Sequence, residues 1–146
     1  MAYKYRPAVA VDLDGVILEY DDWRGPDHFG KPLPGAKKFL QDLREKGIRI
    51  IIHTARVNEV HDGPDPVDMA SKIVSFLWRE DLEFDEVWCG PGKPIALAYV
   101  DDRAIFMSSR VCQDPLTGWG SALAEISVAK GESDKRHEDA PGEIAE

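Results

Sequence analysis

Short apolar segments alternate with amphipathic segments along the first hundred residues, and this alternation is the strongest constraint on the fold. The apolar run at 8–13 lacks the polar alternation of a half-exposed strand, which predicts a strand buried on both faces, as in a parallel sheet. Strands are predicted at 8–13, 48–52, 86–89 and 96–100, and helices at about 36–46 and 67–80. This order predicts an α/β fold with a Rossmann-like parallel sheet flanked by helices.

The composition sets the number of domains and the broad class. The 146 residues include 43% hydrophobic ones, which is typical of one globular domain. A last amphipathic helix is predicted at about 119–129, and the residues after Lys130 are mostly charged or small. We therefore expect a folded core over 1–130 and a disordered acidic tail over 131–146.

The charge balance argues against some partners and favours others. There are 18 basic and 27 acidic residues, which give a formal net charge of −9. Such a chain repels polyanions, which argues against long nucleic acid as a partner without ruling out a local basic groove. Carboxylates are the ligands that hard divalent cations prefer, so the acidic excess is compatible with a metal site.

Two further features bear on location. The longest apolar runs, such as 95–100, are too short to span a bilayer, and no apolar stretch of signal-peptide length follows the first residues. Cys89 and Cys112 form no Cys-x-x-Cys pair. We expect reduced thiols and a cytoplasmic protein with no membrane partner.

Polar residues fall at or just beyond the ends of the predicted strands. Ligands of open α/β sheets bind outside the carboxyl ends of the strands, so these residues should meet at one edge. Several carboxylates there would need a counter-charge, which a lysine and Mg²⁺ could supply, and Mg²⁺ often completes its shell with substrate phosphate. The residues are Asp12 and Asp14, Thr54, Lys93, and Asp101 and Asp102.

Four short motifs carry a resemblance to a known family. Val-Asp-Leu-Asp-Gly-Val at 11–16, His-Thr-Ala-Arg at 53–56, Lys-Pro at 93–94 and Tyr-Val-Asp-Asp at 99–102 resemble, in order, the motifs of haloacid-dehalogenase-type (HAD) hydrolases. The resemblance covers about residues 8–107 and is specific because all four motifs occur in order at strand ends. It implies a small HAD-type phosphatase.

The resemblance implies a role for each acidic residue. Asp12 would be the nucleophile that forms an aspartyl-phosphate. Asp14 would protonate the leaving oxygen and then activate water, and its backbone carbonyl would bind metal together with the Asp12 side chain. Asp101 would bind Mg²⁺, and Asp102 would assist directly or through water. Both can bind only if the strand has ended, since neighbouring side chains on a strand point to opposite faces.

The remaining site residues would bind the phosphoryl group. Thr54 would donate hydrogen bonds through its hydroxyl and backbone N–H, with Ala55 beside it. Lys93 would hold the nucleophile and the phosphoryl charge. Arg56 could contact a second phosphate or acidic group of the substrate, the alternative being a surface ion pair.

The spacing of the motifs leaves no room for a large cap domain. One predicted helix and one connection fill most of the interval from Asp14 to Thr54, and the same holds from Thr54 to Lys93. The Gly- and Pro-rich segment at 16–34 would form a flap whose Trp23 and Phe29 either close over substrate or simply pack. An open site would accept a phosphosugar, a nucleotide or a phosphorylated polymer end, or would borrow a lid from another subunit of a homo-oligomer.

Three other functions compete with a Mg²⁺-dependent phosphatase. A receiver-type signalling module uses similar residues, but there the Lys-Pro pair follows the acidic residues instead of preceding Asp101. A non-catalytic HAD-like binding scaffold would usually lose the nucleophile or the acid, and this chain has both. A phosphotransferase would use the same residues with an acceptor other than water.

Overall fold

The computed structural model describes residues 6–58, 63–108, 112 and 118–139 of the chain. It divides into two units, residues 1–102 and residues 103–146. The first unit contains the sheet and two of the helices, so the predicted core boundary at residue 130 does not coincide with the division at 102.

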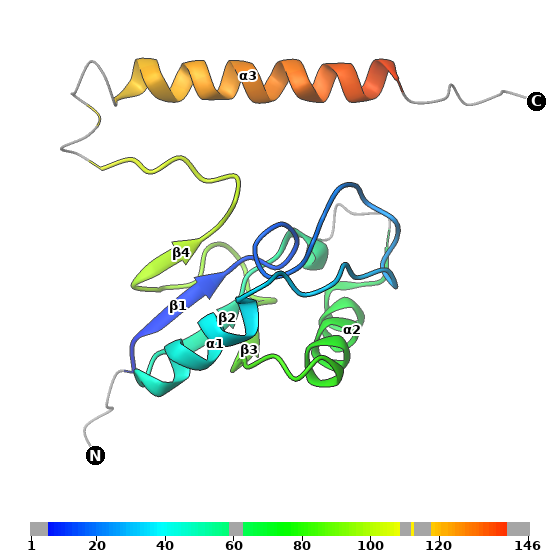
Figure 1. Ribbon diagram of the computed structural model, residues 1–146, viewed down its shortest axis with the longest axis vertical. Helices are drawn as coiled ribbons and strands as arrows, with labels where there is room; N and C mark the ends of the chain where they lie inside the picture. The colour runs from blue at the N-terminus through cyan, green and yellow to red at the C-terminus, as the bar shows by residue number, and fades with distance from the viewer. Residues whose placement is uncertain (1–5, 59–62, 109–111, 113–117, 140–146) are drawn as a thin grey trace, which may run out of the picture. The chain divides into compact units, whose positions relative to one another are not determined.

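The first unit is built on a four-stranded parallel sheet, which confirms the predicted fold class (Figure 1). The strand order is β3-β2-β1-β4, with β1 beside both β2 and β4. All four residues of β1 are buried, as expected for a central parallel strand. The strands are β1 (Ala8–Val11), β2 (Arg49–Ile52), β3 (Glu86–Val87) and β4 (Ala98–Val100).

Two helices of the first unit pack on the same face of the sheet. They are α1 (Ala36–Glu45) and α2 (Pro66–Arg79). The parallel register pairs Val9 with Ile50 and Val11 with Ile52, which places these four side chains on one face. They share a hydrophobic cluster with Leu40 of α1 and with Met69, Ile73, Phe76 and Leu77 of α2.

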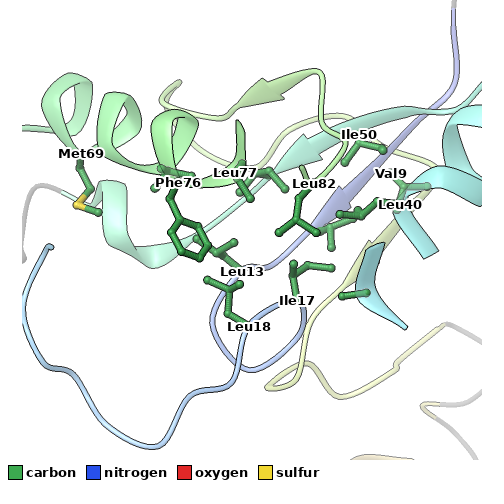
Figure 2. Packing of buried hydrophobic residues seen from close by; sticks show 14 residues of the cluster. Val9, Leu13, Ile17, Leu18, Leu40, Ile50, Met69, Phe76, Leu77 and Leu82 are labelled. Carbon is green, nitrogen blue, oxygen red and sulfur yellow. The ribbon is translucent and has the colours of Figure 1, made fainter. Parts of the chain in front are cut away.

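The turn after β1 is anchored in this hydrophobic cluster. The carbonyl of Leu13 accepts hydrogen bonds from the N–H groups of Ile17 and Leu18, at 3.0 Å each, so the chain curls back directly after the strand. Leu13, Ile17 and Leu18 are fully buried and belong to the same hydrophobic cluster as Phe76 (Figure 2). The curl explains why β1 ends at Val11 and not at the predicted residue 13, and it fixes the loop that carries Asp12 and Asp14.

Large insertions are absent from the described residues between the motifs, as predicted. The described parts of the chain from Asp14 to Lys93 hold α1, β2, the short helix η1 (Ala55–Val57), α2 and β3. The flap segment at 16–34 is irregular apart from isolated bridges of Leu18 to Asp14 and to Pro32.

The second unit contains the helix α3 (Trp119–Glu138), which corrects one prediction. The predicted helix ended at about 129 and the tail was expected to be disordered, but the structure is helical through Glu138. The extension has a local cause: Lys130 pairs with Asp134 one turn on, and basic residues in the last turn match the helix dipole. Residues 140–146 lie outside the described residues. No helix in the described ranges combines the length and apolar character needed to cross a membrane.

Candidate functional site

Three carboxylates gather at the carboxyl end of the two neighbouring strands β1 and β4. Asp12 follows β1, and its N–H donates to the carbonyl of Val100, the last residue of β4, at 2.9 Å. Asp101 and Asp102 come next in the chain. One carboxylate oxygen of each of the three residues lies within 4.8 Å of the others. Because β4 has already ended, the two adjacent aspartates can serve the same site.

The electrostatics of the cluster show most clearly at Asp12. Burial, together with the negative charges of Asp101 and Asp102 and a hydrogen bond with Asp102, raises the pKa of Asp12 from 3.8 to about 7. The N–H of Leu13 donates to Asp12 Oδ1 at 2.8 Å, and this hydrogen bond lowers the pKa in part. A positive charge placed among these oxygens would favour the ionised carboxylate. The donor set therefore fits a hard divalent cation.

Gly15 allows the loop after β1 to approach this cluster closely. Its φ of +83° is unfavourable for residues with a Cβ, and a Cβ built there would lie 2.5 Å from Asp102 Oδ2. The glycine of the first motif thus makes space for a carboxylate of the last motif. This steric role of Gly15 cannot be read from the sequence, because Asp102 follows a different strand.

Asp14 differs from the three clustered carboxylates because its partner is a cation, Arg56. The carboxylate of Asp14 accepts from Arg56 Nε at 2.6 Å and from Arg56 Nη2 at 2.9 Å. The Arg56 side chain is only 4% exposed and that of Asp14 is 15% exposed. For Arg56, the predicted alternative was a surface ion pair. The ion pair is present, but it is largely buried and does not lie on the surface. Asp14 and Arg56 are 42 positions apart, so no local sequence pattern indicates that they form a pair.

Thr54 and Ala55 lie at the end of β2, beside β1. Thr54 is buried, and its Oγ1 accepts from the N–H of Arg56 at 3.2 Å, so that it caps the short helix η1. Ala55 is exposed at the first position of that helix. The hydroxyl thus already has a structural use, and its contact with a phosphoryl group stays a prediction.

Lys93 lies on the exposed segment that leads to β4. Its ammonium is 3.9 Å from the centroid of the Tyr99 ring, within the range of a cation–π contact. The Tyr99 hydroxyl donates to the carbonyl of Pro94 at 2.5 Å. The predicted role of Lys93 at the nucleophile stays a prediction, and a long, exposed lysine can adopt other rotamers at small cost.

The aromatic residues of the flap segment pack instead of standing free. The Phe29 ring stacks on Phe76 of α2 with centroids 4.5 Å apart. Trp23 and Phe29 both lie over the guanidinium of Arg56, at 5.0 and 4.3 Å from its Cζ to their ring centroids. Of the two interpretations of these residues, packing is the one observed.

Comparison of the chain with protein-family models, with curated proteins and with solved structures finds no match. The function therefore has to be argued from the fold and from the chemistry of the residues just described. These define a parallel α/β unit with an acidic cluster at the carboxyl ends of the neighbouring strands β1 and β4.

Proposed function

We propose that this protein is a Mg²⁺-dependent phosphomonoester phosphatase that acts through an aspartyl-phosphate at Asp12. One observation carries the proposal: Asp12, Asp101 and Asp102 lie together at the carboxyl edge of a parallel sheet, with oxygens within 4.8 Å of one another. Ligands of such sheets bind at this edge. The order of the four motifs, which resembles that of HAD hydrolases, gives the cluster its proposed chemistry.

The proposed reaction has two steps. In the first, the carboxylate of Asp12 attacks phosphorus, the bond to the leaving oxygen breaks, and Asp14 gives that oxygen a proton. In the second, Asp14 takes a proton from water, the water oxygen attacks the phosphorus of the aspartyl-phosphate, and inorganic phosphate leaves Asp12 as a free carboxylate. Thr54 and Lys93 would hold the phosphoryl oxygens.

Asp12, Asp101 and Asp102 would hold the Mg²⁺, with the backbone carbonyl of Asp14 as the resemblance implies. The ion would offset the repulsion between these carboxylates and the incoming phosphate. The raised pKa of Asp12 supports this part of the proposal, because burial first, and the negative charges of Asp101 and Asp102 next, disfavour the ionised nucleophile, and a bound cation would oppose both.

The substrate class follows from the lack of a large cap over the described residues. A phosphosugar, a nucleotide or a phosphorylated polymer end could each enter an open site. A cytoplasmic location belongs to the same proposal, because Cys89 and Cys112 are free thiols.

The test is hydrolysis of para-nitrophenyl phosphate with and without Mg²⁺ by the native protein and by Asp12→Asn. We expect Mg²⁺-dependent turnover that the variant loses, since Asn removes the nucleophile with little change of volume. Asp68→Asn, an exposed aspartate in the first turn of α2, is the matched control and should keep full activity.

Two results would decide against the proposal. Full activity in Asp12→Asn would refute the covalent mechanism, and absence of turnover in the native protein on a panel of phosphosugars, nucleotides and phosphorylated polymer ends would favour a non-catalytic scaffold. Release of nitrophenol in excess of inorganic phosphate would mark transfer to an acceptor other than water.

A further inference from the structure

One face of α3 exposes large apolar side chains. Trp119, Leu123 and Ile126 are 66%, 63% and 55% exposed. They follow one another at intervals of four and three residues, so they lie on the same face of the helix. A helix in water normally buries such a stripe against another element, and a contiguous apolar surface that stays exposed indicates a contact with a partner. The described residues leave these three side chains, which we call the α3 stripe, largely uncovered.

The α3 stripe has the spacing of a short coiled-coil seam. If Trp119 is placed at position a of a seven-residue repeat, positions a and d are apolar through the first two repeats. Large residues at a alternate with alanine at d along this seam. In the third repeat the two positions carry a serine and an arginine, so the apolar seam ends before the helix does. The residues at a and d are Trp119, Ala122, Ile126, Ala129, Ser133 and Arg136.

The residues that flank the seam carry complementary charges. Glu125 and Glu132 fall at position g, whereas Lys130 and His137 fall at position e. In a parallel pair of helices, position g of one helix faces position e of the following repeat in the other helix. Glu125 then faces Lys130 of a second copy, and Glu132 faces His137. In an antiparallel pair, g faces g and e faces e, which would set acidic residues against acidic ones.

This charge pattern makes the face self-complementary. Acidic residues on one side of the seam and basic residues on the other match a second copy of the same face related by a two-fold axis, and they do so in the parallel orientation. Within its own helix Lys130 pairs with Asp134, but both side chains are exposed and such pairs are weak. The occupant that the charges fit is therefore a second copy of this chain.

We propose that α3 is a dimerisation helix whose α3 stripe packs in parallel against the same stripe of a second copy. The apolar seam extends over little more than two repeats, which is short for a coiled coil. The dimer should therefore be reversible, with a population that rises with protein concentration. The proposal does not depend on the chemistry at Asp12, and its tests require no turnover.

Sedimentation velocity of the full chain over a wide range of concentrations tests the dimer. We expect Ile126→Asp to raise the Kd of dimerisation about tenfold or more, because it buries a charge in the seam of both copies. Val128→Asp is the matched control. Val128 is 64% exposed on the same helix but falls at position c, away from the seam, so the Kd should not change.

Circular dichroism verifies that the two aspartate variants keep equal helix content. If Ile126→Asp melts the helix, Ile126→Ala carries the test, because alanine favours the helix while it removes most of the apolar side chain. The Kd should then rise less than for Ile126→Asp but in the same direction.

Exchange of charges tests the parallel orientation. Glu125→Lys should weaken the dimer severalfold at low salt, because it sets a like charge opposite Lys130 of the second copy, and adding Lys130→Glu should restore the native Kd. The difference should shrink at high salt, since exposed charges are screened. An antiparallel pair predicts no weakening by Glu125→Lys, because position g would still face position g.

Three results would overturn the proposal. A native chain that stays monomeric at every concentration would show that α3 does not dimerise. An equal Kd for Ile126→Asp and Val128→Asp would show that the interface does not include the α3 stripe. A dimer that Glu125→Lys leaves unchanged or tightens at low salt would exclude the parallel orientation.

Discussion

Asp12 and Asp14 are two residues apart on the same loop, yet the fold gives them opposite surroundings. Asp12 is partly buried beside the carboxylates of Asp101 and Asp102, and burial, followed by these two negative charges, raises its pKa. Asp14 meets the buried guanidinium of Arg56 at two points. The comparison shows how one short motif can supply two different acids. The first is placed where a cation would relieve repulsion, and the second is already held by a cation from the protein.

The largest expected effect concerns the cluster around Asp12. Removing divalent cations with EDTA should abolish turnover. Mg²⁺ at a hundred times its Kd should increase the free energy of unfolding by about 2.7 kcal/mol, which raises the melting temperature. Differential scanning fluorimetry measures the shift. Asp101→Asn should lose most of it and Asp68→Asn none. Unchanged turnover in EDTA would show that the cluster needs no metal.

The next effect concerns the pair of Asp14 with Arg56. Replacing Arg56 by Met should lower the free energy of unfolding by about 2–4 kcal/mol, because it leaves a largely buried carboxylate without its partner. Urea denaturation gives the value. Adding Asp14→Asn to that variant should restore part of the loss. Additive losses in the double variant would mean that the two side chains do not act as a pair.

Gly15 follows Asp14 in the chain and lies against Asp102, so its substitution affects both the Asp14 loop and the acidic cluster. Gly15→Ala should cost about 1–3 kcal/mol, since the positive φ and the 2.5 Å approach to Asp102 are both unfavourable for a Cβ. It should also weaken Mg²⁺ binding by moving Asp102, which calorimetry can measure. Gly47→Ala, at φ +74° with open space around it, separates backbone strain from the contact with Asp102. Equal Mg²⁺ affinity in the two variants would contradict the steric argument.

The smallest expected effect is the pH dependence that Asp12 gives the metal-free protein. Its pKa rises from an ordinary 3.8 to about 7 on folding. The folded protein therefore holds more protons between these values, and the stability due to this group is present below about pH 4 and lost as the pH rises to about 7. Asp12→Asn should be more stable than the native protein at pH 8, by roughly 1–2 kcal/mol after solvent screening, and not at pH 4. Urea midpoints at the two pH values decide the matter; an advantage that is equal at both would point to packing instead of charge.

The sheet and its helices could be predicted closely because they depend on local patterns. Continuous apolar runs marked β1 and β2, and the spacing of apolar residues marked α1 and α2. The ends of β2 and β4 are as predicted, whereas β1 and β3 end two residues earlier, in the case of β1 because the chain turns at Leu13. Amphipathicity underestimates the length of α3, because its last turns are stabilised by pairs such as Lys130 with Asp134 and not by an apolar face.

Local sequence patterns are enough to place polar residues at the carboxyl ends of parallel strands, because apolar runs mark the strands and the residues that follow them mark the turns. Which of these polar residues meet depends on the tertiary structure. Strand order set Asp12 beside Asp101 and Asp102, and loop packing set Asp14 against Arg56, 42 positions away. Burial strengthens the pair of Asp14 with Arg56, because charges that are removed from water interact far more strongly than charges on an exposed surface.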